Sequence, residues 1–206
     1  MTRPALLTLI ALALAGCISQ ARPPKLEQLR GPRLEPALTK PDFILQNLDG
    51  TPFDFRRATR GTVTLIFFGY RNCPDVCPLH LANLAWALRS VPDAERQRVR
   101  VVFVTTDPER DTPDELRSWL QRFDPSFLGV TGTPAALEAA QHSFGMPPAM
   151  RAGELPQGGG YGITHAAQIW AFTPDDSAHV IYPFGVKRED LAADLVTLLH
   201  LWPGSP

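Results

Sequence analysis

Two cysteines, Cys73 and Cys77, stand four residues apart at the point where an apolar run ends and a helical pattern begins. The run from Thr62 to Phe68 is rich in β-branched and aromatic residues and stops at a glycine, which is typical of a buried strand. Pro78 suits a first helical position because its missing N–H would be unpaired there. Residues 79–88 continue with apolar side chains at helical spacing. We therefore expect both thiols in a strand-to-helix turn.

A thiol pair in such a turn can form a disulfide, act as a redox couple or bind a soft metal ion. Cys77 is expected near the helix N-cap, where free N–H groups and the helix dipole favour a thiolate. Pro74 and Pro78 disfavour one continuous helix through both cysteines, so we expect a wide turn that accommodates a metal ion or a reducible disulfide. A purely structural disulfide is disfavoured, because thiols at a helix N-terminus are exposed and activated.

The residues around the thiol pair closely resemble the signature of the SCO/SenC copper-binding proteins. That stretch reads Phe68-Gly69-Tyr70-x-x-Cys73-Pro74-Asp75-x-Cys77-Pro78. A second stretch, Val104-Thr105-Thr106-Asp107-Pro108-Glu109-Arg110-Asp111-Thr112-Pro113, resembles another motif of the family. A third, Tyr161-Gly162-Ile163-Thr164-His165 followed by an aromatic strand and Thr173-Pro174, resembles a third motif. The likeness extends over roughly residues 41–200, in the family's order and spacing.

This resemblance implies a thioredoxin-like protein that helps to assemble the copper centre of cytochrome c oxidase. It implies one copper ion per domain, held by Cys73, Cys77 and His165, and copper(I) is favoured because a soft ion accepts thiolates and an imidazole. From spacing alone, a lone histidine such as His165 is more often structural or exposed, so its role rests on the resemblance. The copper-bearing oxidase subunit is the implied partner, together with a periplasmic copper donor or a thiol–disulfide reductant.

Other side chains compete for a place at the site. His80 lies on the same helical face as Cys77, and we expect it at the surface nearby. Asp107 and Asp111 follow the second central strand at the sheet end that carries the cysteines, where one of them could steady the cysteine turn, although turn and capping chemistry is the simpler role for Asp111. Met146 and Met150 are soft donors, but we expect them to pack in the core.

The third motif departs from the family at two positions. Family members usually carry an aspartate before the histidine and often a serine after it, whereas this chain has Thr164 and Ala166. A carboxylate before His165 would orient the imidazole and raise its basicity. Its absence is expected to weaken copper(II) binding more than copper(I) binding.

Two enzymatic alternatives use the same thiols. A thiol–disulfide reductase would keep the oxidase cysteines reduced, with the more exposed Cys73 attacking first, and it would not need His165. A peroxidase is the weaker alternative, because Tyr70 stands where a threonine would support a peroxidatic Cys73. The reductase therefore remains the principal rival to a copper carrier.

The N-terminus has the pattern of a targeting signal. Arg3 precedes an apolar run over residues 5–15, which is too short for a membrane-spanning helix of about 20 residues. Leu14-Ala15-Gly16-Cys17 resembles a bacterial lipoprotein box, so residues 1–16 are expected to be a signal peptide and Cys17 the lipidated residue; an ordinary secretory signal is the alternative. Residues 17–40 contain several prolines and are expected to form an extended tether to the membrane.

The chain has 206 residues, of which 44% are hydrophobic, and a net charge of -1. This length predicts one domain, residues 41–206, and the charge gives no reason to expect nucleic acid as a partner. The expected fold class is α/β: an N-terminal hairpin over residues 41–55, then strands alternating with helices in a mainly parallel central sheet. Strands are predicted at residues 99–105, 127–130, 146–152, 166–172 and 179–183, helices from Thr112, Thr133 and Asp190, and a flexible loop at residues 155–160.

Overall fold

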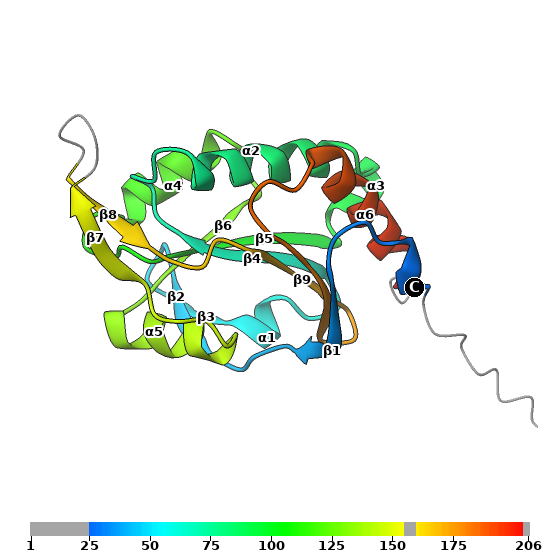
Figure 1. The fold of residues 1–206 in the computed structure, drawn as a ribbon, viewed down its shortest axis with the longest axis horizontal. Helices are drawn as coiled ribbons and strands as arrows, with labels where there is room; N and C mark the ends of the chain where they lie inside the picture. Colours follow the sequence, from blue (N-terminus) through cyan, green and yellow to red (C-terminus); the bar gives the residue numbers. More distant parts are fainter. Residues whose placement is uncertain (1–24, 155–159, 204–206) are drawn as a thin grey trace, which may run out of the picture.

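The computed structural model describes residues 25–154 and 160–203. These residues form one eight-stranded sheet, ordered β1-β10-β9-β4-β5-β6-β2-β3, and a separate two-stranded ribbon of β7 and β8 (Figure 1). The large sheet contains β1 (Arg33–Thr39), β2 (Ile44–Asn47), β3 (Pro52–Asp54), β4 (Val63–Gly69), β5 (Val99–Thr105), β6 (Leu128–Thr131), β9 (Ile169–Thr173) and β10 (Ser177–Tyr182). The β7–β8 ribbon contains Met150–Glu154 and Tyr161–Thr164. The helices are η1 (Leu26–Gln28), α1 (Phe55–Ala58), α2 (Val76–Arg89), α3 (Asp93–Arg96), α4 (Pro113–Gln121), α5 (Pro134–Ser143) and α6 (Arg188–Leu201).

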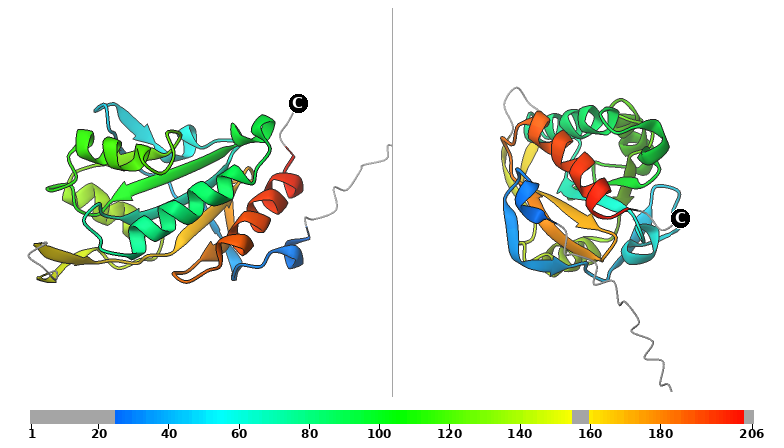
Figure 2. Two further views of the ribbon diagram at one scale, coloured as in Figure 1. Left: turned by 90° about the horizontal axis from the view of Figure 1, so that it is seen from above. Right: turned by 90° about the vertical axis from the view of Figure 1, so that its right-hand side faces the viewer.

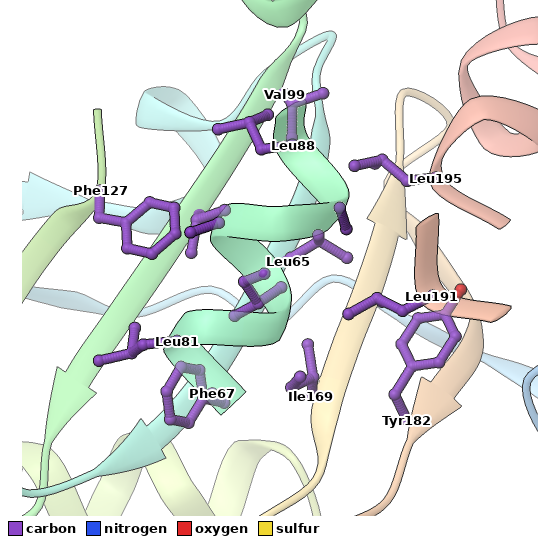
Figure 3. Close-up of a cluster of buried hydrophobic side chains, with 14 of the residues drawn as sticks. Leu65, Phe67, Leu81, Leu88, Val99, Phe127, Ile169, Tyr182, Leu191 and Leu195 are labelled. Carbon is purple, nitrogen blue, oxygen red and sulfur yellow. The ribbon is translucent and has the colours of Figure 1, made fainter. Parts of the chain in front are cut away.

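Strand β4 is buried on both faces because helices cover both sides of the sheet. Successive side chains of a strand point to opposite faces. Leu65 and Phe67 accordingly pack in the cluster that includes residues of α2, α4 and α6 (Figure 3). Ile66 and Phe68 pack on the other side, against α1 and α5. The β-branched and aromatic run predicted from the sequence is therefore the central strand of a three-layer α/β fold.

The sheet is mixed, with parallel strands at its centre. Strand β5 pairs in parallel with both β4 and β6, whereas the other pairs in the sheet are antiparallel. The α/β class and the hairpin formed by β2 and β3 are confirmed. Gly69 pairs with Thr105, so β4 and β5 end at the same level. The cysteine turn and the loop after β5 consequently leave the sheet side by side.

The expected domain boundary at residue 41 must be corrected. Arg33–Thr39, assigned to the tether, forms β1 and pairs with β10. Its Pro36 is tolerated because β1 is an edge strand with one unpaired side. The buried Asp194 of α6 also accepts hydrogen bonds from the backbone N–H groups of Arg30 and Gly31, at 2.8 Å each. The folded domain thus begins before residue 30.

The remaining N-terminal predictions, including the signal peptide and Cys17, concern residues 1–24 and lie outside the described residues. Within residues 25–154 and 160–203, none of the helices has the length and hydrophobicity needed to cross a bilayer. The predicted flexible loop likewise falls almost wholly on residues 155–159, which the structure does not describe.

The β7–β8 ribbon is the main local departure from the expected elements. It projects beyond the body of the sheet in two views (Figures 1 and 2). Strand β7 starts at Met150 rather than Met146, and β8 was not expected. Periodicity could not reveal β8 because Tyr161–Thr164 has only four residues, which is the shortest stretch over which alternation can indicate a strand.

Candidate metal centre

Cys77 packs directly onto the end of β4. Helix α2 begins at Val76, two residues earlier than expected, so Cys77 lies within its first turn. A Cβ atom built on Gly69 would stand only 2.7 Å from Cys77 Sγ and 3.0 Å from a ring carbon of Phe103. Only glycine leaves room for the sulfur at this point, and the side chain of Cys77 is fully buried.

The two thiols differ in charge, and the expectation for Cys77 is wrong. The Cys77 side chain hydrogen-bonds to Cys73 and lowers the pKa of Cys73 to about 3, with further help from His165. The same hydrogen bond and burial raise the pKa of Cys77. The backbone N–H of Cys77 also donates to Cys73 Sγ at 3.4 Å. The free N–H of the first helical turn is thus aimed at Cys73, which makes Cys73 the thiolate and keeps Cys77 protonated in the metal-free protein.

His165 reaches the thiol pair from a distant part of the chain. It follows directly after β8, and its Nε2 lies 3.8 Å from Cys77 Sγ. Its Nδ1 lies 3.0 Å from the backbone oxygen of Ala166; a carbonyl can only accept, so Nδ1 donates this hydrogen bond and Nε2 is the ring nitrogen turned toward the thiols. The Ala166 carbonyl thereby orients the imidazole. In the family pattern a carboxylate at position 164 would do this, but Thr164 has none.

The spacing of these side chains fits a small thiophilic ion. With metal–sulfur and metal–nitrogen bonds of about 2.3 and 2.0 Å, as for zinc, trigonal ligands stand roughly 3.7 Å apart. The Cys77–His165 separation of 3.8 Å matches this value. Across the described part of the chain, however, no three His, Cys, Asp or Glu side chains form a finished ligand cluster. The three residues are in contact, but they form a site that an incoming ion must still draw together.

Both thiols are buried, contrary to the expectation that they are exposed, and Cys73, which is 9% exposed, is the side of the pair that borders solvent. It lines an open groove of about 350 Å³ between the cysteine turn and the β7–β8 ribbon, together with Tyr70, Ile163 and His165. The Tyr70 ring meets the His165 ring edge-on, with centroids 5.7 Å apart. A somewhat larger hollow beside Arg117 contains none of the predicted ligands. An ion or a partner thiol would therefore approach through the groove.

The loop after β5 supports the cysteine turn through Asp111. Its buried carboxylate accepts from the backbone N–H of Arg71 at 3.1 Å and from the hydroxyl of Thr105 at 2.7 Å. Thr106 N–H donates to the Gly69 carbonyl at 2.7 Å. Burial raises the pKa of Asp111. Asp111 therefore steadies the turn, which is the role that the sequence interpretation ranked lower for this residue.

For neighbouring side chains, the structure corrects the expectations for His80 and Met150 and confirms the one for Met146. His80 is buried rather than at the surface; it packs between Phe67 and Phe184, and burial lowers its pKa. Met146 is buried as expected, whereas Met150 is 62% exposed at the start of β7. A helix-surface pattern could not place His80, because the loop that covers it comes from a distant strand.

A model of the SCO1/SenC family matches residues 32–200, which is most of the chain. The chain belongs to the SCO1/SenC family. Mitochondrial protein SCO1 of Saccharomyces cerevisiae is 31% identical to this SCO1/SenC chain over 145 residues, which cover 68% of this chain and 47% of the yeast protein. The chain spans less than half of the length of this relative and of the human SCO2 and Arabidopsis thaliana SCO1 homologs.

Solved SCO1/SenC structures share the thioredoxin-like fold of this chain. Bradyrhizobium japonicum ScoI, solved with copper bound, is 32% identical, has a TM-score of 0.67 and matches 78% of this chain and 99% of that chain. BsSco, described as a member of the Sco family of cytochrome c oxidase assembly proteins with a disulfide switch, is 25% identical with a TM-score of 0.58, over 80% and 95% of the two chains. The fold class and the family resemblance are thus confirmed.

Sequence reasoning named no role for two tyrosines, one in contact with His165 and one in the ribbon beside the site. Tyr70 and Tyr161 both lie within the quoted motifs, yet their partners come from other segments. The sequence offered one general signal: a tyrosine that becomes buried usually finds a hydrogen-bond partner for its hydroxyl. That rule does not say which residue the partner is. Tyr161 hydrogen-bonds to Asp107, the second acidic candidate, so Asp107 serves the ribbon rather than the cysteine turn.

Proposed function

We propose that this chain is an extracytoplasmic, membrane-tethered copper metallochaperone that serves assembly of the copper centre of cytochrome c oxidase. The observation that carries the proposal is the contact of Cys77 Sγ with His165 Nε2 at 3.8 Å, beside the Cys73 thiolate. Membership of the SCO1/SenC family and the copper-bound structure of a relative support the proposal.

Cys73, Cys77 and His165 would hold one copper(I) ion. A soft ion prefers thiolates, and His165 Nε2 would offer a third donor once it has given up any proton to the solvent. Cys73 is already ionised, so of the two thiols only Cys77 must lose a proton on binding. Copper bound here would be passed to a partner by exchange of thiolate ligands. The hard carboxylates Asp107 and Asp111 would stay out of the ligand set and hold the surrounding loops.

Equilibrium dialysis of the reduced protein against copper(I), without oxygen, tests the site. We expect one copper per chain in the wild type, none tightly held in Cys77→Ser, and weaker binding in His165→Ala. His142→Ala is the matched control, because His142 is an exposed histidine on α5. Affinity unchanged by His165→Ala would remove the histidine from the site, and a reduced, folded protein that binds no copper would refute the proposal.

A thiol–disulfide reductase is the second candidate, because the ionised Cys73 faces a groove and Cys77 lies behind it. A strongly ionised thiol, however, stabilises the reduced pair and makes the disulfide oxidising, as in DsbA. Such a pair is poorly suited to reducing another protein, but it stays available for copper. We expect a reduction potential well above that of thioredoxin, about −270 mV. A potential at or below that value would favour the reductase.

The membrane anchor and the partners belong to the same proposal. The lipoprotein box around Cys17 supports attachment to the membrane by a lipid. Cys17→Ser should release the protein from the membrane fraction and leave copper binding by the reduced domain unchanged. Copper transfer to the isolated copper-bearing oxidase subunit, followed by the absorption of that subunit, tests the partner.

A further inference from the structure

The loop from Thr105 to Asp111 connects the two halves of the candidate site. Asp111 bonds to the cysteine turn, and the guanidinium of Arg71 donates back to the Arg110 carbonyl at 3.3 Å. On its other side, the same loop meets Tyr161, the first residue of β8. One short segment is therefore bonded both to the cysteines' turn and to the strand that ends next to His165.

Tyr161 makes two kinds of contact with this loop. Its hydroxyl donates to Asp107 Oδ1 at 2.9 Å, and Asp107 is 3% exposed. The Arg110 guanidinium stacks on the Tyr161 ring, 3.6 Å from the centroid, while it is also paired with Asp107. The Arg151 guanidinium also lies over this ring, 4.4 Å from the centroid. The tyrosine is thus held by a hydrogen bond to a buried carboxylate and by cation–π contact.

The β7–β8 ribbon needs such an attachment. A two-stranded ribbon alone is marginally stable in water, and every residue of β7 is exposed. Ile163 packs against the core, but Tyr161 fixes the other end of β8. From Tyr161 to His165 the chain spans about 13 Å, so a tilt of about 10° would move the imidazole by roughly 2 Å. In a well-formed site, metal–ligand distances stay within about 0.2 Å of their usual values.

We propose that the contact of Tyr161 with Asp107 and Arg110, which we call the tyrosine clamp, is a positioning device that holds His165 against the cysteine pair for copper(I). The clamp acts through the ribbon and touches no ligand. This inference rests on the proposed copper function, and it adds that the third ligand is set by a residue that does not bind the ion.

A double-mutant cycle for copper(I) affinity tests the clamp in the full, reduced chain. Competition with a colorimetric copper(I) chelator gives the dissociation constant. Loss of a hydrogen bond to a charged group predicts about tenfold weaker binding for Tyr161→Phe, and Tyr161→Leu should be weaker still because it also loses the ring contact. In a His165→Ala background, both substitutions should have no further effect.

Glu154→Gln is the matched control on the same ribbon. Its side chain is exposed and makes no hydrogen bond or ion pair within residues 25–154 and 160–203, so we expect less than a twofold change in affinity. X-ray absorption of the copper-loaded protein gives a second readout: the wild type should show two sulfurs and one imidazole, and Tyr161→Leu should show loss of the imidazole signal. A structural role alone would lower the melting temperature without removing that signal.

The possible outcomes distinguish failure of the clamp alone from failure of the copper function. If the wild type binds copper through His165 and Tyr161→Leu matches it in affinity and spectrum, the clamp is refuted and the function stands. If Tyr161→Leu weakens binding equally with and without His165, the tyrosine acts on the whole fold and the clamp is also refuted. If neither the wild type nor the variants bind copper(I), both proposals fail.

Discussion

Asp111 accepts a hydrogen bond at 3.1 Å from the backbone N–H of Arg71, which lies two residues before Cys73. The carboxylate is buried, and it also accepts from Thr105. A residue 40 positions away along the chain thus holds the turn that presents the thiols. This relationship makes the loop after β5 part of the site, although it contributes no expected ligand.

Replacing Asp111 with alanine should destabilise the reduced, metal-free protein. The substitution leaves the Arg71 N–H and the Thr105 hydroxyl without their acceptor, and each buried unsatisfied group costs about 1–3 kcal/mol. We expect a loss of about 2–4 kcal/mol in the free energy of unfolding, measured by urea titration. Copper(I) affinity should fall as well, because the cysteine turn loses its support.

Asp111→Asn is the matched control, because its side-chain oxygen can still accept both hydrogen bonds. Burial raises the pKa of Asp111, so the folded state holds that proton more tightly than the unfolded chain does. The wild-type carboxyl therefore costs stability as the pH rises above about 4. Stability of the Asn variant relative to the wild type should increase between pH 4 and 7. A decrease over that interval would contradict the assigned direction.

Cys73 should react with iodoacetamide at a rate that hardly depends on pH between 5 and 8. The hydrogen bond from Cys77 lowers the pKa of Cys73 to about 3, so Cys73 is already a thiolate throughout this range. In Cys77→Ala the donor thiol is absent, and the pKa of Cys73 should rise toward the ordinary value of about 8.5. The measurement is alkylation rate by mass spectrometry; a wild-type rate that climbs tenfold per pH unit would show that Cys73 is protonated.

Gly69→Ala should weaken copper binding, although the substitution adds only one methyl group. The added methyl group would lie 2.7 Å from Cys77 Sγ and 3.0 Å from Phe103, both buried. We expect destabilisation of about 1–3 kcal/mol from overpacking, with displacement of Cys77. Gly153→Ala is the control. Gly153 lines the groove that borders Cys73, and nothing lies within 4 Å of the added atom. Equal affinities for the two variants would refute the argument.

A shortened chain that begins at residue 41 should be much less stable than one that begins at residue 25. It lacks β1 and the backbone N–H groups of Arg30 and Gly31, which donate hydrogen bonds to Asp194. Of the three groups that donate to Asp194, only the Tyr182 hydroxyl would remain. Leaving a buried charge without its partners costs about 3–5 kcal/mol. Thermal unfolding followed by circular dichroism provides the comparison. Similar melting temperatures would restore the boundary first expected from the sequence.

The sequence by itself determined the elements whose signals are local. The strand at residues 99–105 was predicted with the bounds that β5 has, because a continuous apolar run needs no distant partner to be recognised. The cysteine turn and the helix after it were predicted for the same reason. The meeting of His165 with Cys73 and Cys77 was expected only from the family resemblance, and the structure brings His165 to Cys77. The assignment of these three as copper ligands remains a prediction.

Only the tertiary structure decided which groups act on one another at the site. Cys73 rather than Cys77 is the thiolate, because the first helical turn folds so that the Cys77 N–H and thiol both face Cys73. His165 meets Cys77 across 88 residues, and Tyr161 meets Asp107 across 54. These contacts depend on where β8 and the loop after β5 pack against the sheet end. That packing arises from long-range contacts, which local residue patterns do not encode.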